Sequence, residues 1–281
     1  MTDQELKTLL TDYLGEDEMS ETGQIIYSGI DTLRPGDFYF IGSNPGVDRS
    51  NRVLKELPLN MENWSAYTQQ CWRCGELTGC TKHSKTFHQN NVVALMVELG
   101  LRPEDTFATN LIFREGLKPK LAYADVDMNR YWRLHRRLLM KVKPKYIVCL
   151  GNNLDKDEYS AFRIVRALAD KKTKVVKREQ GKFFRAAFNL EGGGITPMVI
   201  GVRHPSYPGM IIQGLSETLR TVLQLPEVSV DRLRQRLKPA PAYCFASVRG
   251  ADLREEGAGI RRVAGCHRVV AGPLCRVIDR H

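Results

Sequence analysis

Short apolar runs alternate with helical patterns along most of this chain, and the runs contain too few polar residues to have an exposed face. Such runs are typical of strands that are buried on both faces of a parallel sheet. Because strands alternating with helices are joined by right-handed crossovers, the pattern predicts an α/β fold. We expect a three-layer α/β/α sandwich with a central, mainly parallel four-stranded sheet. The predicted strands are 38–42, 106–112, 146–151 and 198–202.

Helical patterns fill most of the gaps between these strands. Residues 91–101 carry apolar side chains at helical spacing and end near Gly100, three residues before Pro103, which predicts a helix. Further helices are predicted at 125–142, 157–168 and 215–223. These segments would supply the two helical layers of the sandwich.

Two segments depart from this alternation. Residues 182–190 are followed by the glycine-rich residues 191–194, which predicts a strand entering a hairpin turn at an edge of the sheet. After residue 238 the sequence becomes rich in Gly, Ala and Arg and shows no sustained period. We therefore expect one folded domain at 1–238 and a poorly ordered C-terminal tail at 239–281.

Basic side chains outnumber acidic ones, with 42 Lys and Arg against 32 Asp and Glu and a formal net charge of +10. Much of the excess lies in two clusters, at 130–145 and 171–178. Clusters of this kind favour a polyanionic partner, because Lys and Arg release counterions from the phosphates of nucleic acid. The alternative is that both clusters are solvated helix ends.

The chain shows no signal for a membrane or a nucleotide cofactor. No apolar run approaches the roughly 18 residues that a membrane span requires, and the first residues lack a basic segment followed by an apolar one. The seven cysteines are unevenly spaced, unlike a disulfide framework. No Walker-type loop occurs, and the glycines at 257–259 do not follow a strand. We expect a cytoplasmic protein with reduced thiols.

Polar residues lie at or just after the end of each predicted strand. The pairs are Ser43 and Asn44, Thr109 and Asn110, Asn152 and Asn153, and His204 and Ser206. Because the carboxyl ends of parallel strands meet at one edge of a sheet, these side chains are expected to share a pocket. The pocket would be rich in amides and poor in carboxylates, which favours a planar ligand that forms hydrogen bonds.

Asn44 has the most informative neighbours. Pro45 restricts Asn44 to an extended conformation, and Gly46 leaves the adjoining wall without a side chain. An asparagine is not a strong base, but it orients a water molecule by accepting one hydrogen bond from it and donating another. Catalysis of this kind is sufficient only where the leaving group departs easily.

These segments resemble a known family. Residues 42–46 (Gly-Ser-Asn-Pro-Gly), Asn110 and residues 204–206 (His-Pro-Ser) together resemble the uracil-DNA glycosylase superfamily, in particular its mismatch-specific and single-strand-selective branches. The resemblance covers about residues 38–223 and implies that Asn44 positions the hydrolytic water. It also implies that Asn110 binds a base flipped out of DNA, and that His204 donates a hydrogen bond to the departing base.

The resemblance further implies a monofunctional DNA glycosylase that hydrolyses the N-glycosidic bond of a pyrimidine, leaves an abasic site and needs no cofactor. Its substrate-binding residues would be Gly42, Ser43, Pro45, Gly46, Trp64 and Asn110. Its DNA-binding loop, which pinches the phosphates, would contain Ser206, Tyr207 and Pro208.

Two positions depart from the family pattern. Gly46 stands where the uracil-specific branch has a bulky aromatic residue that blocks substituents on C5 of the pyrimidine. Leu57 and Pro58 stand where a phenylalanine usually stacks on the base, and the next aromatic residues are Trp64 and Tyr67. The expected substrate is therefore uracil or a C5-modified base. The enzyme would act either in repair or in defence against viral DNA that contains hydroxymethylated or glucosylated cytosine.

A group of metal-ligand residues lies between the first two strands. Cys71, Cys74, Cys80 and His83 fall within a thirteen-residue stretch and could complete a tetrahedral site for a structural zinc ion. The alternative is a cysteine-containing loop that lines the substrate pocket.

Other interpretations of the site stay open at this point. Asn44 could cap a turn before Pro45, Asn110 could form a turn at the strand end, and His204 could be a partly buried structural histidine. A protein of this fold could also bind DNA without cleaving it. A hydrolase of free nucleosides is a third possibility, although the basic clusters argue against it.

Overall fold

The computed structural model describes residues 1–46, 52–57, 59–80, 85–116, 128–151, 160–169, 195–206, 217, 219–221 and 223, and the backbone of 175–180 and 184–189. The chain divides into two units, Met1–Arg236 and Leu237–His281, and the second unit lies wholly outside the described residues. The predicted boundary after residue 238 and the predicted tail therefore stay predictions.

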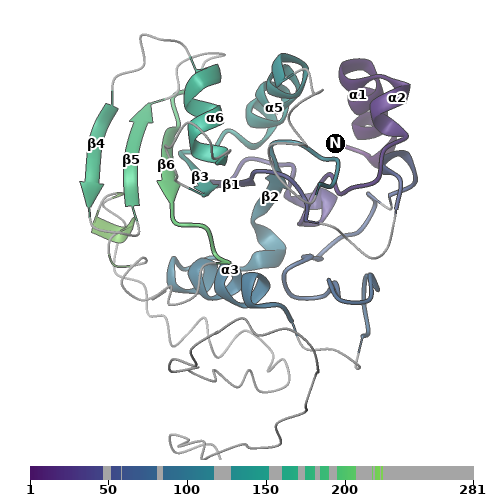
Figure 1. Cartoon of the computed structure of the whole chain (residues 1–281), viewed down its shortest axis with the longest axis horizontal. Coiled ribbons are helices and arrows are strands. Elements are labelled where there is room, and N and C mark those ends of the chain that lie inside the picture. The colour runs from purple at the N-terminus through teal and green to yellow at the C-terminus, as the bar shows by residue number, and fades with distance from the viewer. Residues whose placement is uncertain are drawn as a thin grey trace, which may run out of the picture. The chain divides into compact units, whose positions relative to one another are not determined.

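The four predicted strands form the parallel core of one sheet (Figure 1). They are β1 (Phe38–Gly42), β2 (Phe107–Asn110), β3 (Tyr146–Leu150) and β6 (Met198–Val202). The strands β2, β1, β3 and β6 are neighbours in that order, and each pairs in parallel with the next. The predicted α/β fold with a parallel central sheet is confirmed.

Two antiparallel strands extend the sheet beyond β6, so that six strands pair in the described part of the chain. The strand predicted at 182–190 is β5 (Phe184–Asn189), which pairs with β6. The edge itself is formed by β4 (Val175–Gln180), which the sequence did not predict. Its sequence, VVKREQ, is mostly charged or polar, a composition that protects an edge strand from pairing with other chains.

Helices cover both faces of this sheet. They are α1 (Asp3–Leu14), α2 (Glu16–Met19), α3 (Phe87–Glu98), α5 (Met128–Val142) and α6 (Ala161–Leu168). Short 3-10 helices span Ile30–Thr32, Leu54–Glu56 and Pro103–Asp105. None of the helices in the described part of the chain is long and apolar enough to cross a membrane.

The helix predicted at 91–101 is α3, which begins at Phe87 and ends at Glu98. It starts earlier because Thr86 and Gln89 form a reciprocal capping box, in which each side chain bonds the backbone N–H of the other residue. A second capping box, between Thr2 and Glu5, starts α1, which was not predicted.

The other predicted helices are α5, α6 and a segment at 217–223, of which the described residues are helical. The predicted residues 125–127 and 157–159 lie outside the described part of the chain.

Strand side chains alternate between two hydrophobic layers. Tyr39 and Ile41 point into the layer formed with α1, α5 and α6, whereas Phe38 and Phe40 point into the layer formed with α3 and Leu219. Figure 1 shows α1, α5 and α6 on one side of the sheet and α3 on the other. This arrangement leaves the carboxyl ends of the four parallel strands together at one edge, where the polar residues predicted by the sequence emerge.

Candidate functional site

Asn44, Asn110 and His204 emerge at the same edge of the sheet, because β1, β2 and β6 run in the same direction. β1 lies beside β2 and is separated from β6 only by β3. Since neighbouring strands are about 4.8 Å apart, the ends of β1 and β6 are separated by about 10 Å. That separation would accommodate one aromatic heterocycle.

Asn110 is fixed at the end of β2. It pairs in register with Gly42 on β1, and a Cβ atom at Gly42 would overlap the Asn110 side-chain oxygen. The Asn110 Nδ2 atom donates a hydrogen bond of 2.8 Å to the hydroxyl of Tyr27, in a buried environment. This bond uses one of the two amide N–H donors and sets the direction of the second. Gly42 thus provides room for an asparagine side chain that is already oriented.

Asn44 lies in the loop after β1 and is half-buried. Its Nδ2 atom donates to the backbone oxygen of Pro45 at 2.9 Å and to that of Gly116 at 3.4 Å. Among the described residues, these bonds pair only the amide nitrogen of Asn44. The loop itself is held to the segment after β2, since the Ile112 N–H donates to the Ser43 oxygen at 3.0 Å. Asn44 therefore caps the turn before Pro45, which was one of the alternatives from the sequence. Neither of these bonds uses the Oδ1 atom, which is a hydrogen-bond acceptor.

His204 is held as a neutral imidazole. The backbone N–H of Ser206 donates to its Nδ1 atom at 3.2 Å, so the ring proton lies on Nε2. Burial lowers the pKa of His204 to about 4, which keeps the ring uncharged at pH 7. An uncharged imidazole protonated at Nε2 is a hydrogen-bond donor.

The His204 ring lies beside the end of β3. A Cβ atom at Gly151 would be 3.7 Å from the Cδ2 atom of His204, and Gly151 has a φ angle of +122°. That angle favours glycine, so the turn after β3 places a residue without a side chain next to the imidazole. Asn152 and Asn153, which the sequence assigned to the same edge, lie outside the described residues.

Helix α3 supports the His204–Ser206 segment through two residues that sequence reasoning missed as site residues. The Nδ1 atom of His88 is 2.9 Å from the Ser206 hydroxyl oxygen, and its ring meets that of His204 edge to face at 5.0 Å. The Asn91 side chain donates to the Pro205 oxygen at 2.7 Å. Burial, and next the proximity of His204, lower the pKa of His88 to about 3. The signal in the sequence was two polar residues three positions apart on one face of a helix.

An aromatic row connects Asn110 to His204. It consists of Tyr27, Tyr67, Trp72 and His88, and we use this name for these four residues. Tyr27 stacks on Tyr67 at 5.6 Å and meets Trp72 edge to face at 5.8 Å. Trp72 in turn lies 5.4 Å from His88, measured between ring centroids. The row therefore links Tyr27, which bonds Asn110, to His88, whose ring meets that of His204.

The remaining predicted contacts occupy varied positions. Trp64 is only 5% exposed, packs in the hydrophobic layer beside α3 and donates its indole N–H to the Leu77 oxygen at 3.3 Å. Gly46 is exposed, and no described atom lies within 4 Å of a Cβ built on it.

Thr109 is buried and its hydroxyl donates a hydrogen bond to the Ile25 oxygen, so this hydroxyl stabilises the fold. Of the predicted DNA-binding loop, Ser206 is exposed, whereas Tyr207 and Pro208 lie outside the described residues.

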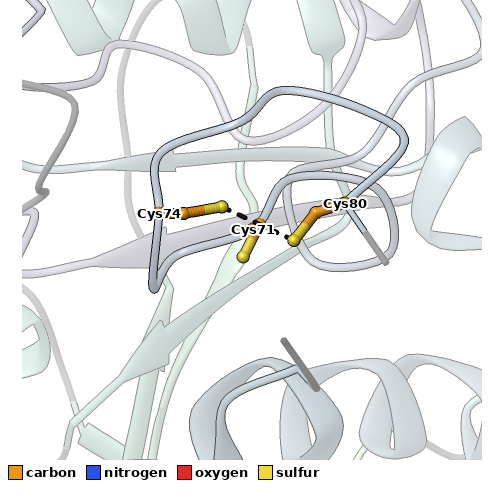
Figure 2. Close-up of side chains that lie close together, drawn as sticks. All are labelled: Cys71, Cys74 and Cys80. Carbon is orange, nitrogen blue, oxygen red and sulfur yellow. Dashed lines mark hydrogen bonds between the residues drawn. The ribbon is translucent and has the colours of Figure 1, made fainter. Parts of the chain in front are cut away.

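Three of the four predicted metal ligands come together. The Sγ atoms of Cys71, Cys74 and Cys80 all lie within 4.8 Å of one another, close enough to bind one metal ion (Figure 2). The fourth predicted ligand, His83, lies outside the described residues. His88, which follows in the sequence, belongs instead to the group around His204.

The three thiols differ in acidity. Burial raises the pKa of Cys71, but hydrogen bonds from the other two thiols and from nearby backbone lower it overall. A hydrogen bond from the Glu76 backbone lowers the pKa of Cys74, but the adjacent Cys71 and Cys80 groups raise it to about 11. Several thiolates this close repel one another unless a cation lies between them.

The first basic cluster does not converge on this edge. Lys141 lies in the last turn of α5, and Lys143 and Lys145 lie between α5 and β3, so all three are near the amino end of β3, opposite to the end where Asn44 and His204 emerge. Arg130 and Arg137 donate instead to Tyr13 of α1, through its backbone oxygen and its hydroxyl. The side chains of the second cluster lie outside the described residues. Charge density along the sequence was thus a poor guide to the direction that these side chains face.

Comparison with known proteins adds no assignment: no protein-family model matches the sequence, and no curated protein is detectably similar to it.

Proposed function

We propose that this protein is a DNA glycosylase that hydrolyses the N-glycosidic bond of a flipped pyrimidine and leaves an abasic site. The observation that carries the proposal is the position of Asn44, Asn110 and a neutral His204 at one edge of the parallel sheet. Each of the three is oriented by a bond to the protein, so the site does not rely on a ligand to order it. The resemblance of residues 42–46 and 204–206 to the glycosylase superfamily supports the same reaction.

In this mechanism the base leaves first and the water adds to the sugar. The electron pair of the N-glycosidic bond moves onto the base, and the His204 Nε2–H donates to the base oxygen where negative charge develops. Asn110 binds the base through the N–H that Tyr27 leaves available. Asn44 accepts a hydrogen bond from the water through Oδ1 and directs the water oxygen to the sugar carbon. The proton that the water loses as its oxygen bonds the carbon neutralises the base anion. No charged base is required, because the leaving group is stabilised.

The substrate is proposed to be uracil or a pyrimidine substituted at C5. The space that the described residues leave beside Gly46 would admit a methyl, a hydroxymethyl or a glucosylated hydroxymethyl group. Such substituents mark mismatched thymine or the modified cytosines of viral DNA, so the site is compatible with repair and with defence. DNA is the proposed partner.

A DNA-binding module without catalysis is the second candidate. The observation that favours it is the pair of bonds from the Asn44 amide to Pro45 and Gly116, which is sufficient to explain Asn44 as a turn cap. A cap at Asn44 does not account for His204, whose Nδ1 atom accepts the Ser206 N–H and whose ring meets that of His88. We therefore favour the enzyme.

The test is an incubation of the full chain with oligonucleotides that contain uracil, mismatched thymine, 5-hydroxymethylcytosine or its glucosylated form, followed by alkali to reveal abasic sites. We expect strand breaks with at least one oligonucleotide, loss of breaks in Asn44→Ala, and retained DNA affinity in that variant. Asn60→Ala, an exposed asparagine, is the matched control. DNA binding without breaks in any oligonucleotide would support the binding module and reject the enzyme.

The three thiols are proposed to hold a structural zinc ion, with His83 as the expected fourth ligand and no part in the chemistry. The support is the mutual approach of Cys71, Cys74 and Cys80 within 4.8 Å, which suits the soft, tetrahedral coordination of Zn²⁺. Elemental analysis of the purified chain should find one zinc per molecule. A folded chain without metal would reject the site.

A further inference from the structure

The loop that carries the three thiols also carries Trp72, which lies directly after Cys71 and two residues before Cys74. Trp72 is half-buried, whereas Tyr27 and Tyr67 of the aromatic row are buried. Its ring contacts both tyrosines, at 5.8 Å and 5.7 Å, and His88 at 5.4 Å. Trp72 therefore contacts both Tyr27, which bonds Asn110, and His88, whose ring meets that of His204.

The indole N–H of Trp72 supports a ligand at this position. The Nε1 atom is buried, and no hydrogen-bond acceptor for it occurs among the described residues. Indole N–H groups usually find a partner when they are buried, since leaving one unpaired is unfavourable. Because this N–H lies in the plane of the indole ring, a phosphate oxygen of bound DNA beside the ring edge would supply the missing acceptor.

A cross-link through the three thiols would restrain the irregular loop that carries Trp72. From Leu59 to Cys80 the described chain forms no helix or regular strand. It is held by individual bonds, such as Cys71 N–H to the Glu76 oxygen at 2.7 Å and Trp64 to the Leu77 oxygen at 3.3 Å. A metal ion bound by three thiolates restrains such a segment much as a disulfide does, and the three thiol protons are released to solvent on binding. Figure 2 shows the three side chains converging within this loop.

We infer that zinc bound to Cys71, Cys74 and Cys80 positions Trp72 as the residue that stacks on the flipped base. Trp72 would then take the place of the aromatic residue that is absent at Leu57 and Pro58. This inference rests on the proposed glycosylase function. One base stacked on an aromatic side chain corresponds to roughly 1–3 kcal/mol, or about 5- to 150-fold in affinity.

The dependence of the Trp72 position on bound zinc, which we call the metal link, is tested without any substrate. The chain has three tryptophans, so the emission of Trp72 is isolated by comparing wild type with Trp72→Phe and with Trp132→Phe, a control in the opposite hydrophobic layer. Removal of zinc by a chelator should change the emission of wild type and Trp132→Phe, and should change that of Trp72→Phe less, because the only other tryptophan bonded to this loop among the described residues is Trp64, through the Leu77 oxygen. Cys74→Ser should lose zinc, whereas Cys149→Ala, a buried cysteine of β3, should keep it. An unchanged emission after zinc loss would overturn the link.

The stacking role is tested by binding. In an Asn44→Ala background, Trp72→Ala should lower affinity for a uracil-containing oligonucleotide about 5- to 150-fold, and Trp72→Phe should restore most of it. Equal affinity of Trp72→Ala and the parent would overturn the stacking role even if wild type forms abasic sites. Conversely, a zinc-dependent Trp72 emission in a chain that cleaves none of the four oligonucleotides would reject the proposed function and leave the metal link standing.

Discussion

His204 gives the sharpest test of the proposed site, because its protonation follows from the structure and can be measured without a substrate. Burial lowers its pKa from 6.5 to about 4. At pH 7 a group with a pKa of about 4 is protonated in about one molecule in a thousand, whereas a group at 6.5 is protonated in about one in four. The Ser206 N–H that donates to Nδ1 further requires the proton of the neutral ring to lie on Nε2.

Nuclear magnetic resonance of histidine-labelled protein measures both properties. The chain has six histidines, and His204→Gln identifies the signal of His204. We expect a midpoint near pH 4 and nitrogen shifts typical of the Nε2–H form. Ser206→Ala should change neither, because the donor to Nδ1 is the backbone. Arg203 precedes His204 in the sequence, and the ring of His88 meets that of His204 edge to face at 5.0 Å.

The catalytic consequence follows from the same geometry. Removing one donor that stabilises developing charge typically lowers the rate by about 10²- to 10³-fold, and His204→Ala should do so at unchanged DNA affinity. The rate of the wild type should stay level from pH 8 to about 5 and fall only below that. A midpoint near 6.5, or a neutral ring protonated on Nδ1, would refute the assignment of His204 as the leaving-group donor.

Three further predictions follow from other parts of the molecule. Gly42→Ala should abolish abasic-site formation, because the new Cβ displaces the Asn110 amide, whereas Gly36→Ala, whose nearest atom would be 3.8 Å away, should retain it. Gly46→Tyr should preserve excision of uracil and abolish that of C5-substituted bases; equal loss of both would contradict the role of the open space. The free energy of unfolding, measured in urea, should fall as the pH drops from 6.5 to about 4. The folded protein lowers the pKa values of His88, His135 and His204, so the unfolded chain binds more protons than the folded chain in this pH window. For the buried His135, the fall from 6.5 to about 4 corresponds to about 3 kcal/mol, and His135→Gln should reduce the acid-induced loss accordingly.

The parallel core of the fold was predictable because its strands are apolar throughout. β1 and β6 have the predicted bounds, since a run such as Phe-Tyr-Phe-Ile can be buried on both faces only in the middle of an α/β sheet. β4 could not be found in this way, because an edge strand is selected for polarity. Likewise α1 contains apolar residues at Leu6, Leu10 and Leu14, but only its packing against α5 shows that it belongs to the domain.

The candidate site was predictable only for residues at the end of a strand or directly after it. Asn44, Asn110 and His204 could be placed at one edge from topology alone, whereas the strand order that sets their spacing could not. The residues that orient them come from distant segments: Tyr27 precedes β1, and His88 and Asn91 lie on α3. No local pattern distinguishes a helical histidine that supports a catalytic segment from one that faces solvent.

Asn44 shows why a structural and a catalytic interpretation of one residue can both hold. The turn cap uses the nitrogen of the amide, whereas positioning a water uses its oxygen, and the two atoms diverge from the same planar carbon. The bonds to Pro45 and Gly116 fix the amide plane, so Oδ1 presents its lone pairs in one direction before the substrate arrives. A weak acceptor benefits from this most, because its contribution depends on geometry rather than basicity. The cap is therefore part of the catalytic arrangement, and a residue that kept the oxygen but lost the nitrogen would keep the acceptor without its orientation.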